Sequence, residues 1–262
     1  MKIINKQEAL QTIESMGLKY VMEADSLRYL IEDEEDVVCV TGEDMLVTRY
    51  QSRGVTYITV IPLHDTFDTD ALLAFVKESS VKVSMLINVQ SLREEFIKDM
   101  DEKLSDAFVH ERNLIDYVYH HSAALTPSNH IRLLGTEDKE LFVACTQETI
   151  QNRPPLAVLF DVFIRRNQGQ IFAAFAGEKI VGYLSFNRVA QQVFDVDYIY
   201  VVPEMRGRGI GKQLATAYTL YAQDCNHVAY WSNAKNQASE RTAISCGFGV
   251  IRRVQKYITK DI

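Results

Sequence analysis

The feature that most restricts the fold of this chain is a strand-like run that leads through a turn of glycines and arginines into a helix-like run. It spans residues 200–212, and its turn and first helical residues are Arg206, Gly207, Arg208, Gly209, Ile210, Gly211 and Lys212. The first N–H groups of a helix have no partner within the helix, and the helix dipole favours negative charge there. Glycines let the backbone approach a phosphate closely and adopt a positive φ, while the three cations add charge. The segment therefore predicts an α/β fold with an anion site that can hold a pyrophosphate.

Two phosphate-binding motifs do not match this segment. Gly211-Lys212 is followed by Gln213 instead of Ser or Thr, so it is not a Walker A loop. Gly207, Gly209 and Gly211 stand two residues apart, unlike the Gly-x-Gly-x-x-Gly of dinucleotide-binding folds. The alternative reading is a tight strand-to-helix turn that carries surface arginines.

Charge and cysteine usage narrow the class of protein. The net charge of −7 argues against a general nucleic-acid binder, although residues 201–262 hold nine Lys or Arg against four Asp or Glu. Neither a membrane-spanning apolar run nor a secretory h-region is expected, and the four cysteines lie far apart in no metal-ligand spacing. We therefore expect a reduced, cytoplasmic protein without a metal site, with a specific anionic ligand on its basic segment.

The first half of the chain alternates short strand-like and helix-like segments. Helices are predicted over 8–22, 69–78 and 92–100, and strands over 37–40, 45–50, 55–61, 81–89 and 113–119, with the acidic run 32–36 as a loop. The polar segment 125–129, which contains Pro127, predicts the boundary between a domain of residues 1–125 and one of residues 126–262.

The second half has a clearer order. Strands are predicted over 131–134, 171–175, 180–186, 193–202, 228–231 and 250–258, and helices over 136–146, 156–165, 209–224 and 236–245. The sequence 176–179 between two apolar strands is typical of a hairpin turn.

Two motifs in the second half resemble those of the GCN5-related N-acetyltransferases (GNAT). Residues 206–211 match the family's Arg/Gln-x-x-Gly-x-Gly/Ala motif, and Asn236 with the later Gly247-Phe248 resembles its second motif. The resemblance covers about residues 129–262 and implies a twisted mixed sheet flanked by helices. A smaller α/β domain precedes it, for which a degenerate copy of the same fold stays open, because its order of strands and helices is similar. The role of residues 1–125 is not otherwise indicated.

The resemblance implies acetyl-CoA as co-substrate and direct transfer of its acetyl group to an amine, without an acyl-enzyme. Backbone groups of Tyr200, Val201 and Val202 would bind the pantetheine arm, and the amides of 206–212 the pyrophosphate. Asn236 would contact the CoA arm, with Ser239 close enough to assist.

Two acids on the strand before the turn are the candidate bases. Asp195 matches the position of a catalytic Glu in histone-acetylating relatives, and Asp197 that of a His in arylalkylamine-acetylating ones. A period of two places Asp195, Asp197, Ile199 and Val201 on one face of the strand. The alternative is that the acids cap the sheet edge or pair with an arginine.

The sequence departs from the family at the general acid, because the position of the usual Tyr is Ala243. Cys246, Ser245, Tyr257 and Tyr198 are the substitutes the sequence offers, and unassisted departure of the thiolate is another solution. Two alternatives therefore stay open: a non-catalytic acyl-CoA-binding regulatory module, and an acyltransferase that uses another acyl-CoA. The expected partners are a small-molecule or peptide amine and a second copy of the chain in a homodimer, with neither nucleic acid nor membrane.

Overall fold

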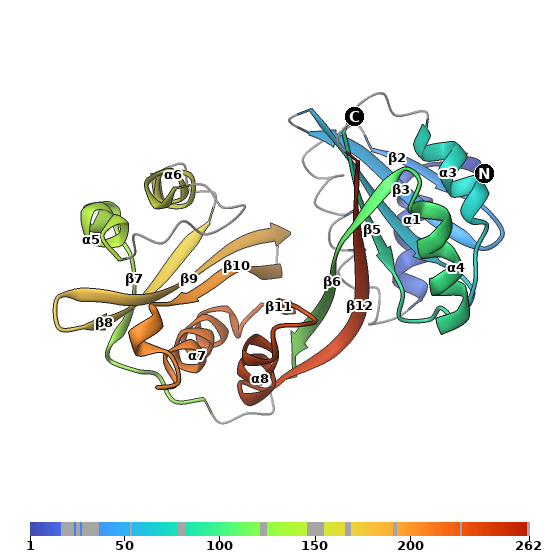
Figure 1. Cartoon of the computed structure of the whole chain (residues 1–262). Helices are drawn as coiled ribbons and strands as arrows, with labels where there is room; N and C mark the ends of the chain where they lie inside the picture. The colour runs from blue at the N-terminus through green and yellow to red at the C-terminus, as the bar shows by residue number, and fades with distance from the viewer. Residues whose placement is uncertain are drawn as a thin grey trace. The chain divides into compact units, whose positions relative to one another are not determined.

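The computed structural model describes residues 1–16, 24, 27, 37–52, 54–77, 82–120, 125–145, 155–165, 169–190, 193–225 and 227–260. The chain divides into two compact units, one formed by residues 1–116, 232–236 and 250–262, the other by residues 117–231 and 237–249. Both are mixed α/β, as predicted (Figure 1). Neither unit is one stretch of sequence, and the domains 1–125 and 126–262 stay a prediction. Residues 17–22 of the first predicted helix and the acidic run 32–36 lie outside the described residues.

The first unit is built on a sheet with the strand order β1-β2-β3-β4-β5-β12. Its elements are β1 (Lys2–Ile4), α1 (Lys6–Ser15), β2 (Val38–Thr41), β3 (Met45–Ser52), β4 (Val55–Pro62), α3 (Thr69–Lys77), β5 (Lys82–Asn88), α4 (Glu94–Leu104) and most of β6 (Phe108–Tyr119) and β12 (Phe248–Thr259). Strands β2, β3 and β4 form an antiparallel meander, and β4 and β5 are parallel. The end of the chain returns to this unit, since Val254–Ile258 of β12 pair with β5.

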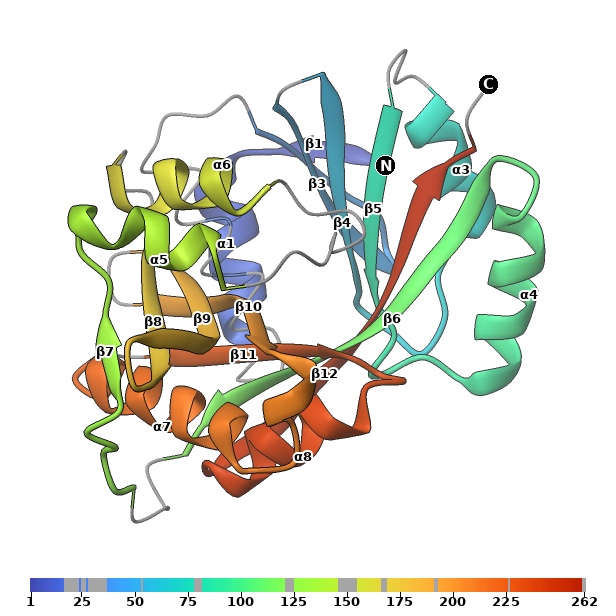
Figure 2. The ribbon, with the colours of Figure 1, turned by 60° about the vertical axis from the view of Figure 1, so that its left-hand side comes forward.

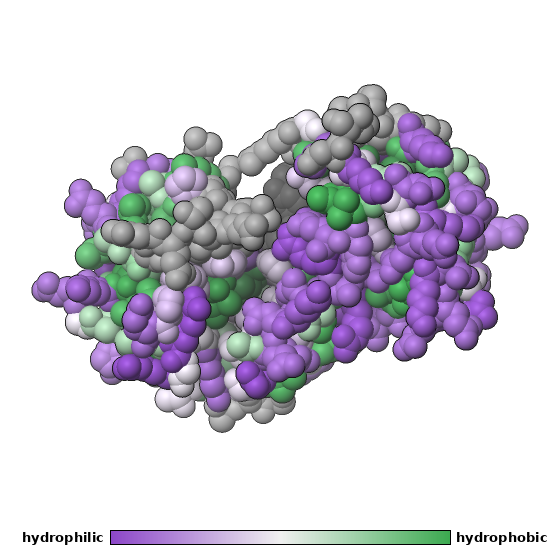
Figure 3. Space-filling model, viewed as in Figure 1, coloured by the Kyte–Doolittle hydropathy of each residue, from purple (hydrophilic) through white to green (hydrophobic). Residues whose placement is uncertain are grey.

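Alternating side chains give this sheet two apolar faces. Val60 packs in a cluster with residues of α3 and α4, whereas the next residue, Ile61, packs with α1. Helix α4 buries Met100 and Leu104 and exposes charged residues, so its outer surface is hydrophilic (Figure 3). In the parts of the chain that the structure describes, every helix is too short or too polar to span a membrane.

The second unit contains strands in the order β11-β10-β9-β8-β7. Its elements are β7 (Ile131–Leu133), the 3₁₀ turn η2 (Thr136–Asp138), α5 (Lys139–Val143), α6 (Leu156–Phe160), the π-helical turn η3 (Asp161–Arg165), β8 (Gln170–Ala176), β9 (Lys179–Ala190), β10 (Val193–Val201), η4 (Pro203–Met205), α7 (Ile210–Ala222), β11 (His227–Asn233) and α8 (Gln237–Ser245). Each predicted helix and strand of this half is present, with ends shifted by a few residues.

Helices cover both faces of these strands. Phe142 of α5 and Phe160 of α6 pack with Tyr183 of β9 on one face, and α7 lies on the other (Figure 2). The approach of α7 is close at Gly182, where a Cβ would lie 3.3 Å from Ile210 and 2.9 Å from the carbonyl oxygen of Tyr200. Glycine is therefore required at this crossing, because any larger side chain would push the helix or strand away.

The chain repeats one order of elements. In the run β1–β6 and again in β7–β12, a short strand and one or more helices precede three antiparallel strands, and a helix, a parallel strand, a second helix and a last strand follow. Most of the last strand of the second run, β12, belongs to the first unit. The helices α3 and α7 occupy the same place in this order, and so do β4 and β10. The order agrees with a second copy of one fold, which stays a proposal for the first unit.

A buried carboxylate fastens β7 to the helical segment that follows it. Asp138 accepts two hydrogen bonds of 2.7 Å from the Arg132 guanidinium and one of 2.8 Å from the N–H of Gly135. The Arg132 hydrogen bonds hold the pKa of Asp138 below its ordinary value, against the effect of burial, and the Gly135 N–H adds to them. Asp138 is 3% exposed, so its charge depends on these partners.

We predict that Asp138→Asn lowers the free energy of unfolding by about 1–3 kcal/mol at pH 7, since hydrogen bonds to a buried charge are lost. The folded-state pKa is below the unfolded value of about 3.9, so this stabilisation is present above that pH and disappears as pH falls through the folded pKa. Urea unfolding of both proteins at neutral and acidic pH measures it. Asp70→Asn is the control, because it breaks an exposed pair with Lys103 and should change stability little. A difference between Asp138→Asn and the parent that persists in strong acid would contradict this.

Candidate functional site

The parallel pairing of β10 with β11 stops early and leaves a fork. It joins Val193–Asp195 to His227–Ala229, whereas β10 continues to Val201 and stays paired with β9 along its other edge. Beyond Asp195 the edge of β10 that faces away from β9 therefore lies outside the ladder with β11. Backbone N–H and C=O groups along such an edge can bind an extended ligand as a strand would.

Tyr218 of α7 marks the point of the fork. Its hydroxyl oxygen lies 2.8 Å from the carbonyl oxygens of Phe194 on β10 and Ala229 on β11. Burial raises the pKa of this phenol well above its ordinary value, and the charge of Asp195 raises it further. The hydroxyl thus stays protonated and its one hydrogen serves both carbonyls. It ties the last paired residues of the two strands together.

A β-bulge interrupts β10 at Asp197. Val196 lies opposite Phe186 and Tyr198 opposite Ser185, so two successive residues of β9 face a stretch of three on β10. The alternation shifts there, and Ile199 falls on the α7 side, where its Cδ1 lies 3.9 Å from the position of a Cβ on Gly211. The prediction that the two acids share a face with Ile199 and Val201 is therefore wrong, because a period of two holds only in an unbroken strand.

Both candidate acids lie on the face opposite α7. Asp195 is paired with Asn187, which shares a face of β9 with Ser185. Asp197 Oδ2 accepts a hydrogen bond of 3.0 Å from Ser185 Oγ, and both acids are half-buried. The structure brings the two carboxylates to one side of the fork, as expected, and their role as base stays a prediction.

The turn after β10 has the backbone that the glycines predict. Gly207 and Gly209 have φ of +77° and +79°, in the left-handed region, and Gly209 is the N-cap of α7. Nothing lies within 4 Å of the position of a Cβ on either residue. Gly211 is an ordinary helical residue whose Cβ would make contacts of 3.8 Å and longer. Two of the three glycines are therefore required by conformation, and the space above them is open.

The charged residues of the turn are arranged unequally. Arg206 donates from Nε to the carbonyl oxygen of Val201 at 2.9 Å, and its guanidinium lies 5.7 Å from the ring centre of Tyr200. Arg208 and Lys212 are exposed beside the first turn of α7. These cations and the first N–H groups of the helix all favour an anion at this end.

Tyr200, Val201 and Val202 are predicted to bind an extended arm, but their backbone groups point to different edges of β10. Val202 donates its N–H to the carbonyl oxygen of Val181 at 3.0 Å, toward β9, and the carbonyl oxygen of Tyr200 also points to β9. Successive residues of a strand point to opposite edges, so Val201 is the one whose backbone faces the fork. Ile199 shares that edge, and sequence reasoning missed it because pairing direction cannot be read from residue types.

Helix α8 brings further predicted residues to the second unit. Ser239 lies 2.8 Å from the hydroxyl of Tyr230, whereas Asn236 falls in the first unit. Cys246 is buried, with its Sγ 3.6 Å from the Lys212 carbonyl oxygen, and burial raises the pKa of its thiol. Ala243 is fully buried.

The residues offered as substitutes for the missing Tyr are dispersed. Tyr257 is in the first unit, where its hydroxyl bonds Asp101 and Gln255. Ser245 is exposed and donates to the Thr242 carbonyl oxygen at 3.0 Å. Tyr198 is half-buried on β10, with its ring 6.2 Å from that of Tyr183. Of these four substitutes, only Cys246 and Tyr198 both belong to the second unit and are at least half-buried.

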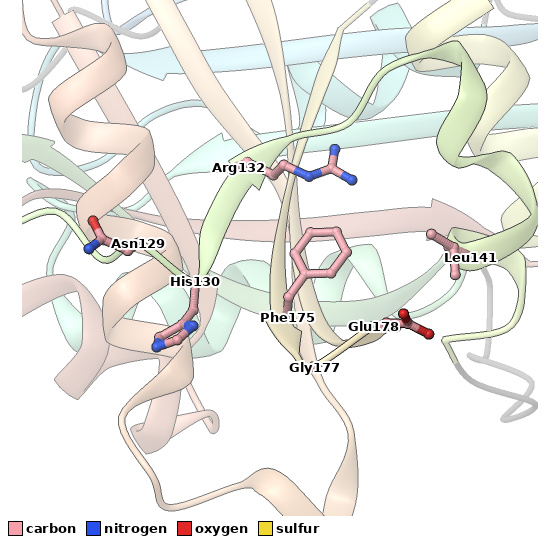
Figure 4. A pocket seen from close by; sticks show the side chains of 7 residues that line it. All are labelled: Asn129, His130, Arg132, Leu141, Phe175, Gly177 and Glu178. Atoms are coloured by element: carbon pink, nitrogen blue, oxygen red, sulfur yellow. The ribbon is translucent and has the colours of Figure 1, made fainter.

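A surface pocket in the second unit shares no residue with the predicted site (Figure 4). It is lined by Asn129, His130, Arg132, Leu141, Phe175, Gly177 and Glu178. The guanidinium of Arg132 forms an ion pair with Asp138 and lies 4.6 Å from the ring centre of Phe175. The pocket is open to solvent, and its cation, Arg132, is already used in the ion pair that holds β7.

Comparison with known proteins identifies the fold. Residues 134–248 match the model of the Acetyltransferase (GNAT) family, which confirms the resemblance expected for this half. A Drosophila protein is similar over 99% of this chain and 98% of its own, with a TM-score of 0.65 and 14% identity. A GCN5-related N-acetyltransferase from Sphaerobacter thermophilus is similar over 100% and 96%, with a TM-score of 0.63 and 13% identity.

A third structure supports the same conclusion. An acetyltransferase of the GNAT family from Colwellia psychrerythraea is similar over 99% of both chains, with a TM-score of 0.57 and 15% identity. At these identities the likeness shows the fold alone. No curated protein gives a significant match.

We predict that Gly207→Ala and Gly209→Ala each lower the free energy of unfolding by about 1–2 kcal/mol, the cost of a left-handed backbone with a Cβ. Gly211→Ala should be neutral or stabilising, because alanine is favoured over glycine within a helix by about 0.5–1 kcal/mol. Urea unfolding of the three variants measures this. Equal losses at positions 209 and 211 would show that the turn does not need its positive φ.

Proposed function

Because residues 134–248 belong to the Acetyltransferase (GNAT) family, we propose that this protein moves an acetyl group from acetyl-CoA directly onto an amine. Acyl transfer is the chemistry of the family; the acetyl donor and the amine acceptor are our proposal. The observation that carries it is the left-handed Gly207-x-Gly209 turn that starts α7 directly after the strand that parts from β11.

The residues present fit a CoA molecule. The open space above Gly207 and Gly209 adjoins the first N–H groups of α7, which would hold the pyrophosphate together with Arg208 and Lys212. The edge of β10 at Val201 would take the pantetheine arm by backbone hydrogen bonds. Bound acetyl-CoA would supply a thioester carbon that an amine can attack.

The acids of β10 would act on the acceptor. An amine is protonated at neutral pH and must lose a proton before it can attack, so it needs a base nearby. Asp195 and Asp197 lie on the face of β10 that also carries Tyr198 and Tyr200. Carboxylates beside aromatic rings attract a cation, so this face suits an amine acceptor, and we favour Asp195 as the base.

The acceptor could be a small molecule or a peptide, and the acidic remainder of the chain favours a cationic one. The cytoplasmic location and the homodimer remain proposals. Ala243 in place of the usual Tyr keeps the regulatory, non-catalytic reading open as the second candidate. A screen of amines with acetyl-CoA that measures free thiol release tests the activity and identifies the acceptor class.

We predict that CoA and acetyl-CoA bind with similar, micromolar-range affinity, on the order of −7 to −8 kcal/mol. Gly209→Val should weaken binding at least about tenfold, because its side chain would fill the space of the phosphate and strain the turn. Gly54→Val is a matched control, since Gly54 also has a positive φ of 75° and open space around it, but lies in the β3–β4 turn. Calorimetry on folded variants should show loss at position 209 alone, and unchanged affinity there would refute the CoA site.

We further predict that Asp195→Asn lowers the rate at neutral pH by about 10²–10⁴-fold while acetyl-CoA binds as before. The defect should shrink as pH rises, because more of the amine is then already deprotonated. A pH–rate profile at saturating acetyl-CoA measures this for Asp195→Asn and Asp197→Asn, with the exposed Asp224→Asn as control. Profiles parallel to the parent in both variants would mean that neither acid moves the proton. In a non-catalytic module the double variant would keep its binding and have no turnover to lose.

A further inference from the structure

The family position for a tyrosine on α8 is occupied by Ala243, but a tyrosine hydroxyl reaches the same face of this helix from β11. Ser239 and Ala243 stand four residues apart on α8, so they lie on one side of the helix, one turn from each other. The hydroxyl of Tyr230 lies 2.8 Å from Ser239 Oγ. The hydroxyls of Tyr230 and Ser239 thus meet one helical turn from Ala243, the position where the family has its tyrosine.

This hydroxyl pair is next to the fork. Tyr230 follows Ala229, the last residue of β11 that pairs with β10. Its ring is fully buried, and it packs against Phe248 at 5.6 Å and Tyr117 at 6.1 Å between ring centres. The phenol is therefore fixed in position by aromatic neighbours, with its polar end on α8.

Helix α8 also lies along the first turn of α7. Thr242 Oγ1 is 3.8 Å from the position of a Cβ on Gly211, and Cys246 Sγ is 3.6 Å from the carbonyl oxygen of Lys212. Ser239 is one turn before Thr242 on the same helix. The fork, the anion-binding turn and the Tyr230–Ser239 pair are thus neighbours within one unit.

By geometry either hydroxyl can donate in this hydrogen bond, and acidity favours the phenol as the donor. A phenol is a stronger donor than a serine hydroxyl, and burial raises the pKa of Tyr230 to about 12, so it keeps its proton at any working pH. With Tyr230 as donor, Ser239 Oγ is the acceptor and its own hydrogen points away from the phenol. Hydrogen bonds in such a chain strengthen one another.

We propose that Ser239 donates a hydrogen bond to the sulfur of departing CoA, and that Tyr230 is the positioning residue that orients and polarises it. This inference rests on the proposed function. Ser239 would stabilise the electron pair that stays on sulfur when the C–S bond breaks, and the thiolate would take its proton from water. The Tyr230–Ser239 pair would thereby do from β11 and α8 together what a single helical tyrosine does elsewhere.

The test measures the pKa of the CoA thiol bound to the full chain, by titrating the ultraviolet absorbance of the thiolate. A hydrogen bond to the thiolate lowers this pKa, so Ser239→Ala should raise it by about one unit, a tenfold change in the preference for thiolate. Tyr230→Phe should raise it less, and the double variant should match Ser239→Ala, because the two residues act in series. Ser105→Ala removes the hydroxyl of the C-cap residue of α4, which donates to the carbonyl oxygen of Glu102 in the first unit, and should leave the thiol pKa unchanged.

Binding and turnover provide a second measurement. Acetyl-CoA carries no thiol, so its affinity should stay within about twofold in all these variants, while kcat of Ser239→Ala falls about tenfold with KM unchanged. A bound-thiol pKa that is the same in the parent and Ser239→Ala would overturn the inference while leaving the CoA site intact. A parent protein that binds no CoA would overturn both this inference and the proposed function.

Discussion

The second unit depends on the early end of one parallel ladder. Because β10 and β11 pair over only Val193–Asp195, the rest of β10 has a strand on one side and a fork on the other. Tyr218 holds the two strands together at the last paired residues, so the separation starts at a fixed point. The proposed site starts at that point: Asp195 is the last residue of β10 that pairs with β11, and Asp197, the backbone edge at Val201 and the turn into α7 follow it. An extended ligand could not bind the backbone edge of β10 at Val201 if the ladder continued.

The first unit shows what the same order of elements becomes without the fork. Its parallel ladder between β4 and β5 runs from Val55 to Val60, along most of both strands. The helix that follows, α3, is capped by its own chain, since Asp68 Oδ1 accepts from the N–H groups of Asp70 and Ala71 at 3.0 Å. In α3 a carboxylate of the protein thus binds the first N–H groups of the helix. In α7 the corresponding N–H groups follow two left-handed glycines, which carry no side chain to bind them. The comparison explains why we place the anion site in the second unit alone.

The sequence predicted local structure well and long-range pairing poorly. Residue patterns located the strands and helices because they depend on periodicity and on turn residues such as Gly177 and Gly209. The bulge at Asp197 could not be read from the sequence, since Asp-Val-Asp-Tyr alternates as an unbroken strand would, and so the faces of Ile199 and Val201 were assigned wrongly. The Tyr230–Ser239 contact was likewise invisible, because it joins a strand to the next helix through packing. A hydroxyl-bearing residue one turn before Ala243 was the one signal available for it.

The return of the C-terminal strand limits how the role of the first half can be separated from that of the second. Val254–Ile258 pair with β5, and Tyr257 packs in the core formed by α3 and α4. A fragment starting near residue 126 would therefore keep β12 but lose its partner strand β5, leaving Val254 and Tyr257 without their apolar neighbours and the backbone groups of the strand without their ladder. If such a fragment lost activity, the unpaired strand would explain the loss as well as a missing acceptor surface would. The contribution of the first unit is better separated by point substitutions that keep the β5–β12 ladder, because those leave both units folded.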